Sequence, residues 1–228
     1  MLGLLAGLFA ILPGRQQTPT MGTMQLVFMR KTNSKPRLSK EEREKFQREH
    51  QDGLRQLWES GRAVTVGRLD DSSYAELVLL NTKDPAEATE WLKNDPYINS
   101  GMLTLDILPW YFQNVFQKAP NFNDVEKIWF GILQRPRNAP QYSATKLEEL
   151  QSGHMSNIQK MANDGILAAA GPLLSKEGRR GIFVFFAKDL AKIKRSVAVD
   201  PLIQAKLLEL KLMPWWTGKG TVVQYKPK

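Results

Sequence analysis

The chain contains no cysteine and only two histidines among its 228 residues. The absence of cysteine excludes disulfides, thiol nucleophiles, cysteine metal ligands and the lipid-bearing cysteine of bacterial lipoproteins. The two histidines, His50 and His154, are 104 residues apart and follow no His-x-x-His or His-Glu-x-x-His spacing. The sequence therefore predicts no zinc site, and we expect function without a metal or another cofactor.

A hydrophobic run long enough to cross a membrane is also missing from the start of the chain. Residues 1–12 (MLGLLAGLFAIL) fall short of the roughly 20 apolar residues of a membrane span. The run is similar to the core of a signal peptide, although no Lys or Arg precedes it and no clean Ala-x-Ala site follows. We expect residues 1–23 to be a signal peptide or a disordered tail and the protein to be periplasmic or secreted. An uncleaved anchor, a misassigned start or a cytoplasmic location are the alternatives.

Two stretches that each carry one histidine repeat the same pattern. In residues 46–61 and 147–165 the histidine shares an apolar helical face with residues three or four positions away. Each histidine is followed by two glycines, an Asp-Pro pair and a Pro-Trp pair, with offsets of 104 and then 105 residues between the copies. The landmarks are His50 and His154, Gly61 and Gly165, Gly67 and Gly171, Asp95-Pro96 and Asp200-Pro201, Pro109-Trp110 and Pro214-Trp215. The sequence therefore predicts a tandem duplication of a unit of about 100 residues.

Each unit predicts the order βαββαβ. In the first unit we expect strands at 24–30, 62–69, 74–80 and 103–110 and helices at 39–60 and 84–93, with Asp95-Pro96 as a break. The second unit repeats this order: strands at 127–134, 166–173, 181–187 and 207–215, and helices from 143 and 188. This order is typical of a ferredoxin-like α+β fold, an antiparallel sheet with both helices on one face. The other face must be covered, and two sheets packed face to face in one chain would cover it.

We place the first domain at residues 24–110 and the second at 126–217. Residues 111–125 form the linker between them, and Phe112, Phe116 and Phe122 indicate that it packs against the body. The C-terminal tail at 218–228 contains a candidate extra strand at 221–225.

The net charge of +9 is concentrated in the second unit. Residues 21–123 carry 14 Lys and Arg against 14 Asp and Glu, whereas residues 124–228 carry 17 against 9. The basic clusters of the second unit are Arg179-Arg180 and Lys188, Lys192, Lys194 and Arg195. These clusters are either an ordinary solvated surface or the source of a positive electrostatic potential that attracts an anionic small molecule or a polyanion.

A histidine and an aspartate in each unit could carry chemistry: His50 with Asp95, and His154 with Asp200. In this topology the chain returns along the sheet after its second helix, so the Asp-Pro turn would approach the middle of the first helix. The carboxylate would then hold one ring nitrogen and leave the other free to take and return a substrate proton. The alternative is a hydrogen-bonded core histidine and an aspartate that only caps a turn.

The order of these motifs resembles the YCII-related family of the dimeric α/β-barrel group over nearly all of residues 24–216. The second unit carries His154, GILAAAGPL at 165–173, RGIF at 180–183 and Asp200-Pro201. The first carries His50, GRAVTVG at 61–67 and Asp95-Pro96, but has Arg68 where Pro172 stands. The resemblance implies that the two sheets form a barrel, so that the tandem copies replace the usual homodimer with an intramolecular one.

The resemblance also implies that the His-Asp dyad is the active site. Related members include an enzyme that eliminates chloride from a chlorinated hydroxyhydroquinone. We therefore expect a metal-independent lyase or isomerase that transfers protons on a small acidic or aromatic substrate. We favour the second site, with His154 and Asp200 as catalytic residues and Gly171, Pro172 and Arg180 binding the substrate. His50 and Asp95 form the other candidate site, which the departure at Arg68 weakens.

Two other classes of function stay open. The barrel could be a non-catalytic small-molecule-binding or structural protein, in which case protein groups would satisfy both nitrogens of each histidine. Alternatively, RGIFVFF at 180–186 is similar to an RNA-recognition strand, with one residue missing and Ile182 in place of an aromatic residue. Phe183 and Phe185 would have to face solvent to stack on bases, whereas we expect a barrel to bury them.

Overall fold

The first half of the chain forms the predicted order of strands and helices. The computed structural model describes residues 21–174 and 178–223. Residues 1–20 of the predicted signal peptide or tail lie outside the described residues, whereas residues 21–23 belong to the first strand, which begins earlier than the predicted start at 24 because it pairs with the end of the fourth strand. The elements are β1 (Met21–Lys31), α1 (Lys40–Glu59), β2 (Ala63–Leu69), β3 (Tyr74–Leu80), α2 (Pro85–Leu92), α3 (Pro96–Asn99) and β4 (Leu103–Gln113). Within the described ranges, no helix combines the length and the apolar character needed to cross a bilayer.

The second half repeats this order. Its elements are β5 (Val125–Gln134), α4 (Ala144–Asn163), β6 (Leu167–Pro172), β7 (Arg179–Phe185), α5 (Leu190–Ala198), α6 (Pro201–Gln204) and β8 (Glu209–Gly218). We expected each Asp-Pro pair only to end the preceding helix, and this is incomplete because a second, short helix begins at each pair. The short helices α3 and α6 begin there, because an aspartate N-cap and a proline at the first helical position start a new turn. Of the strand expected at 221–225, the described part makes a single bridge, between Val222 and Phe116.

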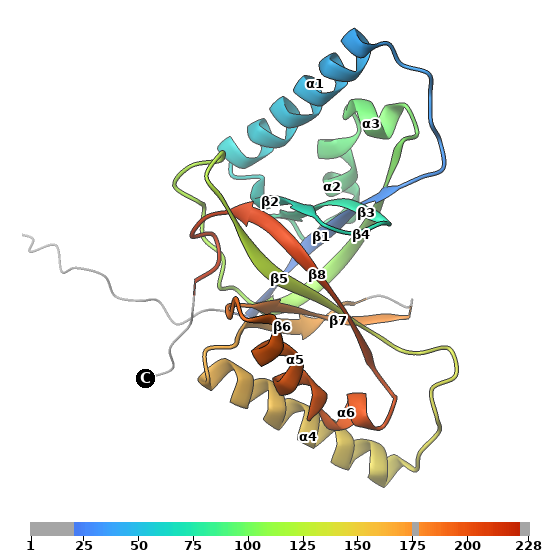
Figure 1. Ribbon diagram of the computed structural model, residues 1–228, viewed down its shortest axis with the longest axis vertical. Helices are drawn as coiled ribbons and strands as arrows, with labels where there is room; N and C mark the ends of the chain where they lie inside the picture. The colour runs from blue at the N-terminus through green and yellow to red at the C-terminus, as the bar shows by residue number, and fades with distance from the viewer. Residues whose placement is uncertain (1–20, 175–177, 224–228) are drawn as a thin grey trace, which may run out of the picture.

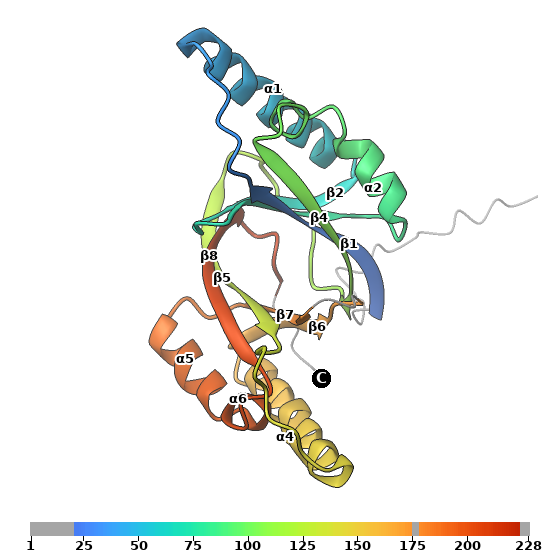
Figure 2. The ribbon, with the colours of Figure 1, turned by 90° about the vertical axis from the view of Figure 1, so that its right-hand side faces the viewer.

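The two four-stranded sheets join at their edges into one antiparallel sheet of eight strands. Its order is β4-β1-β3-β2-β8-β5-β7-β6, so β2 of the first half pairs with β8 of the second. The outer strands β4 and β6 also meet, through a bridge between Trp110 and Leu173. Figures 1 and 2 show the helices of the two halves at opposite ends of the molecule, with the strands between them. The sheets thus curve into a nearly closed barrel and do not stack as two separate layers.

The inner face of the barrel holds a hydrophobic cluster built by both halves. Its largest buried side chains come from both halves of the chain: Phe28, Trp110, Phe112, Phe130 and Trp215. Two of the predicted linker phenylalanines, Phe112 and Phe116, belong to this cluster, and Phe122 packs against the cluster beneath α1 and α2.

The outer face of the sheet is covered by the helices. Phe183 and Phe185 lie on this face, in a cluster with Met161 of α4 and Ile193 of α5. The two phenylalanines are buried, as we expected, but the helices bury them and not the pairing of the two sheets into a barrel. Both rings are at most 1% exposed and cannot form the stacking platform that an RNA-recognition strand needs.

Two repeated glycines lie where the two halves meet. A side-chain carbon on Gly67 would stand 2.3 Å from Nε1 of Trp215, and one on Gly171 would stand 2.0 Å from the carbonyl oxygen of Tyr111. The indole Nε1 of Trp110 donates a hydrogen bond of 3.2 Å to the carbonyl of Gly171. Each glycine thus permits close approach of the Pro-Trp strand of the other half. The repeated glycines and Pro-Trp pairs are therefore among the residues through which the two halves contact each other.

Candidate functional site

The long helix of each half places its histidine on the buried face. In α1 the N-cap Ser39 and Glu42 form a capping box, and His50 lies on the same buried face as Leu54 and Leu57. In α4 the corresponding N-cap is Ser143, and the buried residues are Leu150, His154, Asn157 and Met161. The apolar residues spaced three or four positions from each histidine therefore form the face by which the helix packs on its sheet, and the imidazole lies on that face.

The Asp-Pro pair presents a carboxylate to each histidine. Oδ1 of Asp95 accepts the backbone N–H groups of Tyr97 and Ile98, which leaves Oδ2 for Nδ1 of His50 at 2.5 Å. Asp200 is arranged in the same way: Oδ1 accepts the N–H of Leu202, and Oδ2 lies 2.7 Å from Nδ1 of His154. Helix capping by one oxygen therefore orients the other toward the imidazole.

In the first half a second carboxylate binds the other ring nitrogen. Oε1 of Glu76 lies 3.2 Å from Nε2 of His50, and the histidine is 3% exposed. Burial by itself would lower the pKa of His50, but the hydrogen bonds and charges of Asp95 and Glu76 outweigh it and raise the pKa to about 9. At neutral pH His50 is therefore an imidazolium held between two carboxylates, with both nitrogens satisfied.

His50 and Glu76 line a cavity of about 770 Å³. Its wall includes the cations Lys31, Lys35 and Arg68. Arg68, the residue that departs from the family motif, pairs with Asp70 at 2.8 Å on the surface. Polar and charged side chains line part of this cavity, but the imidazole that borders it has no free nitrogen to offer.

In the second half the histidine has one satisfied nitrogen. His154 is 7% exposed, and its ring lies nearly parallel to that of Phe183, with the centroids 6.2 Å apart. Within residues 21–174 and 178–223, no side chain binds Nε2 of His154. Because Nδ1 is held by Asp200, the nitrogen that this imidazole can offer to a ligand is Nε2.

Asp200 is fully buried. Burial alone would raise the pKa of this carboxyl, but the hydrogen bond and charge of His154 more than offset it and hold the pKa below its usual value. The side-chain amide of Asn157 adds a hydrogen bond of 3.3 Å to Oδ2. Asn157 therefore fixes the carboxylate that orients the imidazole.

The difference between the two histidines comes from one strand position. Glu76 of β3 pairs with Met29 of β1, and Gly181 of β7 pairs with Leu133 of β5, next to the same register shift in each sheet. Gly181 is therefore the counterpart of Glu76. The second half has no side chain where the first half has the carboxylate that binds Nε2.

The structure brings the predicted residues of the second site to one cavity. His154, Gly171, Pro172 and Arg180 all line a space of about 1070 Å³. Asp200 stands behind His154 and does not line it. Arg180 is exposed and, within the part of the chain that the structure describes, makes no ion pair. Arg135 is a second cation on the wall, so the cavity combines one free imidazole nitrogen with positive charge.

Sequence reasoning missed three residues of these sites. Asn157 lies three positions after His154 and so shares its helical face, a signal that was present in the sequence. Glu76 interrupts an otherwise apolar strand, YAELVLL, which also marks it as unusual. Arg135 follows directly on β5 and carried no signal. Among the described residues, no group of three or more His, Asp or Glu side chains could hold a metal ion.

Comparison with known proteins places the first half in a family. Residues 24–111 match the YCII-related domain, and this half of the chain belongs to that family. No curated protein matches the chain.

Solved structures share the fold of the whole chain. A heme-binding protein from Thermus thermophilus is 16% identical, with a TM-score of 0.51 over 88% of this chain and 94% of that one. A protein provisionally named a chlorite dismutase is 9% identical, with a TM-score of 0.52 over 89% and 94%. At these identities the likeness shows the fold alone, that of the dimeric α/β barrels, which this protein builds within one chain.

Proposed function

We propose that the second half is a general acid/base site for a small anionic substrate, with His154 and Asp200 as its catalytic pair. The observation that supports this most directly is the asymmetry of the imidazole. Nδ1 of His154 is bound to a buried carboxylate, whereas Nε2 borders a cavity of about 1070 Å³. A general base needs a free nitrogen next to room for the substrate, and this histidine has both.

The proposed step is proton transfer at a carbon next to a carbonyl group. Nε2 of His154 takes the proton, and the electron pair of the C–H bond moves to the carbonyl oxygen to form an enolate. The imidazolium, stabilised by Asp200, then returns the proton to the same or a neighbouring atom. Arg180 would pair with the carboxylate of the substrate, while the backbone at Gly171 and Pro172 forms the wall beside it.

In the same proposal His50 is not a base. Its imidazole already carries a proton at neutral pH and is bound by Asp95 and Glu76. We infer that this trio stabilises the first half, so that the chain has one acid/base site and not two.

Deuterium exchange tests this function even though the natural substrate is not identified. The protein is incubated in D₂O with a panel of 2-oxo and 3-oxo carboxylates, and loss of the acidic C–H signal is followed by NMR. We expect exchange above the buffer rate, reduced about 10²- to 10⁴-fold in His154→Gln and also reduced in Asp200→Asn. His50→Gln is the matched control and should retain the exchange.

Two results would contradict the proposal. Equal exchange in the wild type and His154→Gln would remove the catalytic role of this histidine. No exchange above buffer for any member of the panel would count against acid/base chemistry and favour a binding protein.

A binding function is the second candidate, and heme is the ligand to test because the Thermus thermophilus protein of the same fold is described as heme-binding. The residues of the second cavity fit such a group. Asp200 on Nδ1 leaves Nε2 for a metal, the arrangement typical of metal-ligating histidines, and most of the wall is apolar. His154 would then hold the heme iron through Nε2 and Arg180 would pair with a propionate, while the bound heme would supply redox chemistry.

A titration with hemin distinguishes this candidate. A saturable shift of the Soret band at one equivalent, lost in His154→Ala and kept in His50→Ala, would support heme binding. The absence of a saturable shift would rule out heme binding as the function of this cavity.

A further inference from the structure

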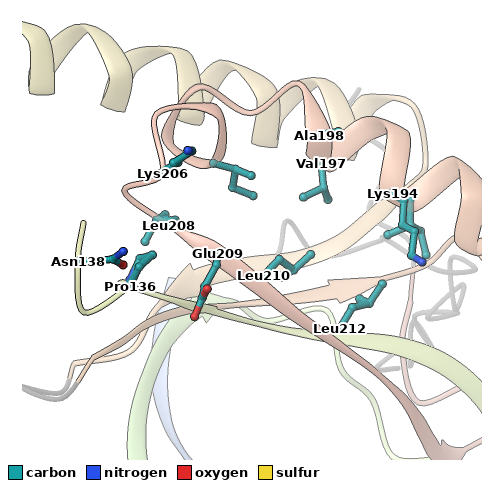
Figure 3. Close-up of a pocket in the computed structure, with 12 residues that line it drawn as sticks. Pro136, Asn138, Lys194, Val197, Ala198, Lys206, Leu208, Glu209, Leu210 and Leu212 are labelled. Carbon is teal, nitrogen blue, oxygen red and sulfur yellow. The ribbon is translucent and has the colours of Figure 1, made fainter. Parts of the chain in front are cut away.

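A second hollow in the basic half lies away from His154, between α5, α6 and the start of β8. It encloses about 550 Å³, within the usual range of ligand pockets. Figure 3 shows α5 and α6 on one side of this groove and the side chains of Leu208, Leu210 and Leu212 on the other. Leu208 also lines the cavity of His154, so the two spaces share a wall but are separate.

The floor of the groove is apolar and its rim is cationic. Seven of the residues that line it are aliphatic: Ile193, Val197, Ala198, Ile203, Leu208, Leu210 and Leu212. Lys194 and Lys206 border the groove, and neither makes an ion pair within the described ranges of the chain. The one acid on the rim, Glu209, accepts a hydrogen bond of 2.8 Å from Gln134. An apolar floor with unpaired cations fits a ligand that has an apolar chain and an anionic head.

Comparison of the two halves shows that both cations are specific to the second half. At the offset of 105 residues, Thr89 stands where the second half has Lys194, and Gly101 stands where it has Lys206. Gly101 and Lys206 both follow the short helix and have positive φ, 72° and 56°. A left-handed backbone suits glycine and strains lysine. The second half therefore keeps a lysine at a position where the fold favours glycine.

We propose that this groove binds a single-chain anionic amphiphile, a carboxylate with an apolar tail of medium length. The tail lies along Leu208, Leu210 and Leu212, and the carboxylate pairs with the lysines of the rim. The net positive charge of the second half raises the local concentration of such anions. This site is independent of the acid/base function proposed for His154.

Binding of decanoate, measured by isothermal titration calorimetry below its micellar concentration, tests the proposal. We expect one decanoate per chain, and no binding of decanol or decylamine. Lys206→Gly and Lys194→Thr introduce the residues of the first half, and each should weaken binding about tenfold, as expected for loss of one charge-assisted contact. Lys192→Ala removes an exposed charge of α5 that does not line the groove, and it should leave the affinity within about twofold.

The variants also separate a site from a general attraction of anions. Ala198→Trp should fill the groove and abolish binding, while circular dichroism reports whether the variant is folded. Unchanged affinity in Lys206→Gly, equal weakening in Lys192→Ala, or binding of several decanoates per chain would each overturn the proposal. Lys206→Gly relieves a strained backbone and is expected to stay folded, and circular dichroism of this variant separates a loss of binding from unfolding.

Discussion

Raising the pH through the range between 6.5 and about 9 should destabilise the folded protein, because His50 loses a proton that the fold holds. Burial lowers the affinity of His50 for its proton, but Asp95 and Glu76 together raise the pKa from 6.5 to about 9. The folded protein therefore binds more protons than the unfolded chain in this range. The stabilisation is complete below pH 6.5 and is lost as the pH rises through about 9.

The size of the effect follows from the same values. One unit of pKa corresponds to 1.36 kcal/mol, so the shift from 6.5 to about 9 is equivalent to about 3 kcal/mol. This is a large part of the 5–15 kcal/mol that is typical for a domain. Urea unfolding at pH values from 6 to 10, followed by the fluorescence of the six tryptophans, measures the free energy of unfolding at each pH.

The variants assign this pH dependence to one residue. In His50→Gln the fall in stability between pH 6.5 and 9 should be smaller by about 3 kcal/mol than in the wild type. Glu76→Gln removes one of the two charges and should give an intermediate slope. His154→Gln is the matched control and should keep the slope that depends on His50. If His50→Gln retained the full pH dependence, the proposed charged trio would be refuted.

Four further substitutions test the fold and its local features by urea unfolding. Gly67→Ala places a carbon 2.3 Å from Nε1 of Trp215 and should lower the free energy of unfolding by about 3 kcal/mol. Its control, Gly53→Ala, places a carbon with nothing within 4 Å inside a helix and should raise that free energy by about 1 kcal/mol. Equal effects of the two substitutions would argue against a close contact between the halves. Ser39→Ala removes the capping box of α1 and should lower stability by about 1 kcal/mol; no change would show that the cap is dispensable. Lys206→Gly should raise stability by about 1 kcal/mol, and a loss would show that its left-handed backbone is not strained.

Local patterns were sufficient to predict the four strands and the two longer helices of each half, but not the short helices α3 and α6. The spacing of apolar residues around each histidine predicted the long helices, and Gly61 and Gly165, with φ of 75° and 66°, end them as expected of left-handed C-terminal glycines. Repetition then predicted the duplication, since each copy supported the other. The boundaries were less accurate because strand length depends on the partner strand. β4 continues to Gln113, beyond the predicted end at 110, because it pairs with β1 from its first residue, Met21.

The way in which the halves join could not be read from such patterns. The pairing of β2 with β8 depends on contacts between residues about 150 positions apart, such as the hydrogen bond between Thr65 and Thr217. No periodicity in either strand specifies that partner. The structure explains the repeated Gly67 and Gly171, of which sequence reasoning had given a role only to Gly171, in binding the substrate. Gly171 lies both at the contact between the two halves and on the wall of the cavity beside His154.

The candidate sites were predicted through what the two copies share, and this is also why their difference was missed. A search for repeated landmarks finds His50 with His154 and Asp95 with Asp200, but it passes over Glu76, whose counterpart is Gly181. In a homodimer one sequence would place the same residue in both sites. Duplication within one chain lets the two halves differ at a single strand position. One imidazole can then be enclosed by two carboxylates and stabilise the fold, while the other keeps a free nitrogen beside a cavity.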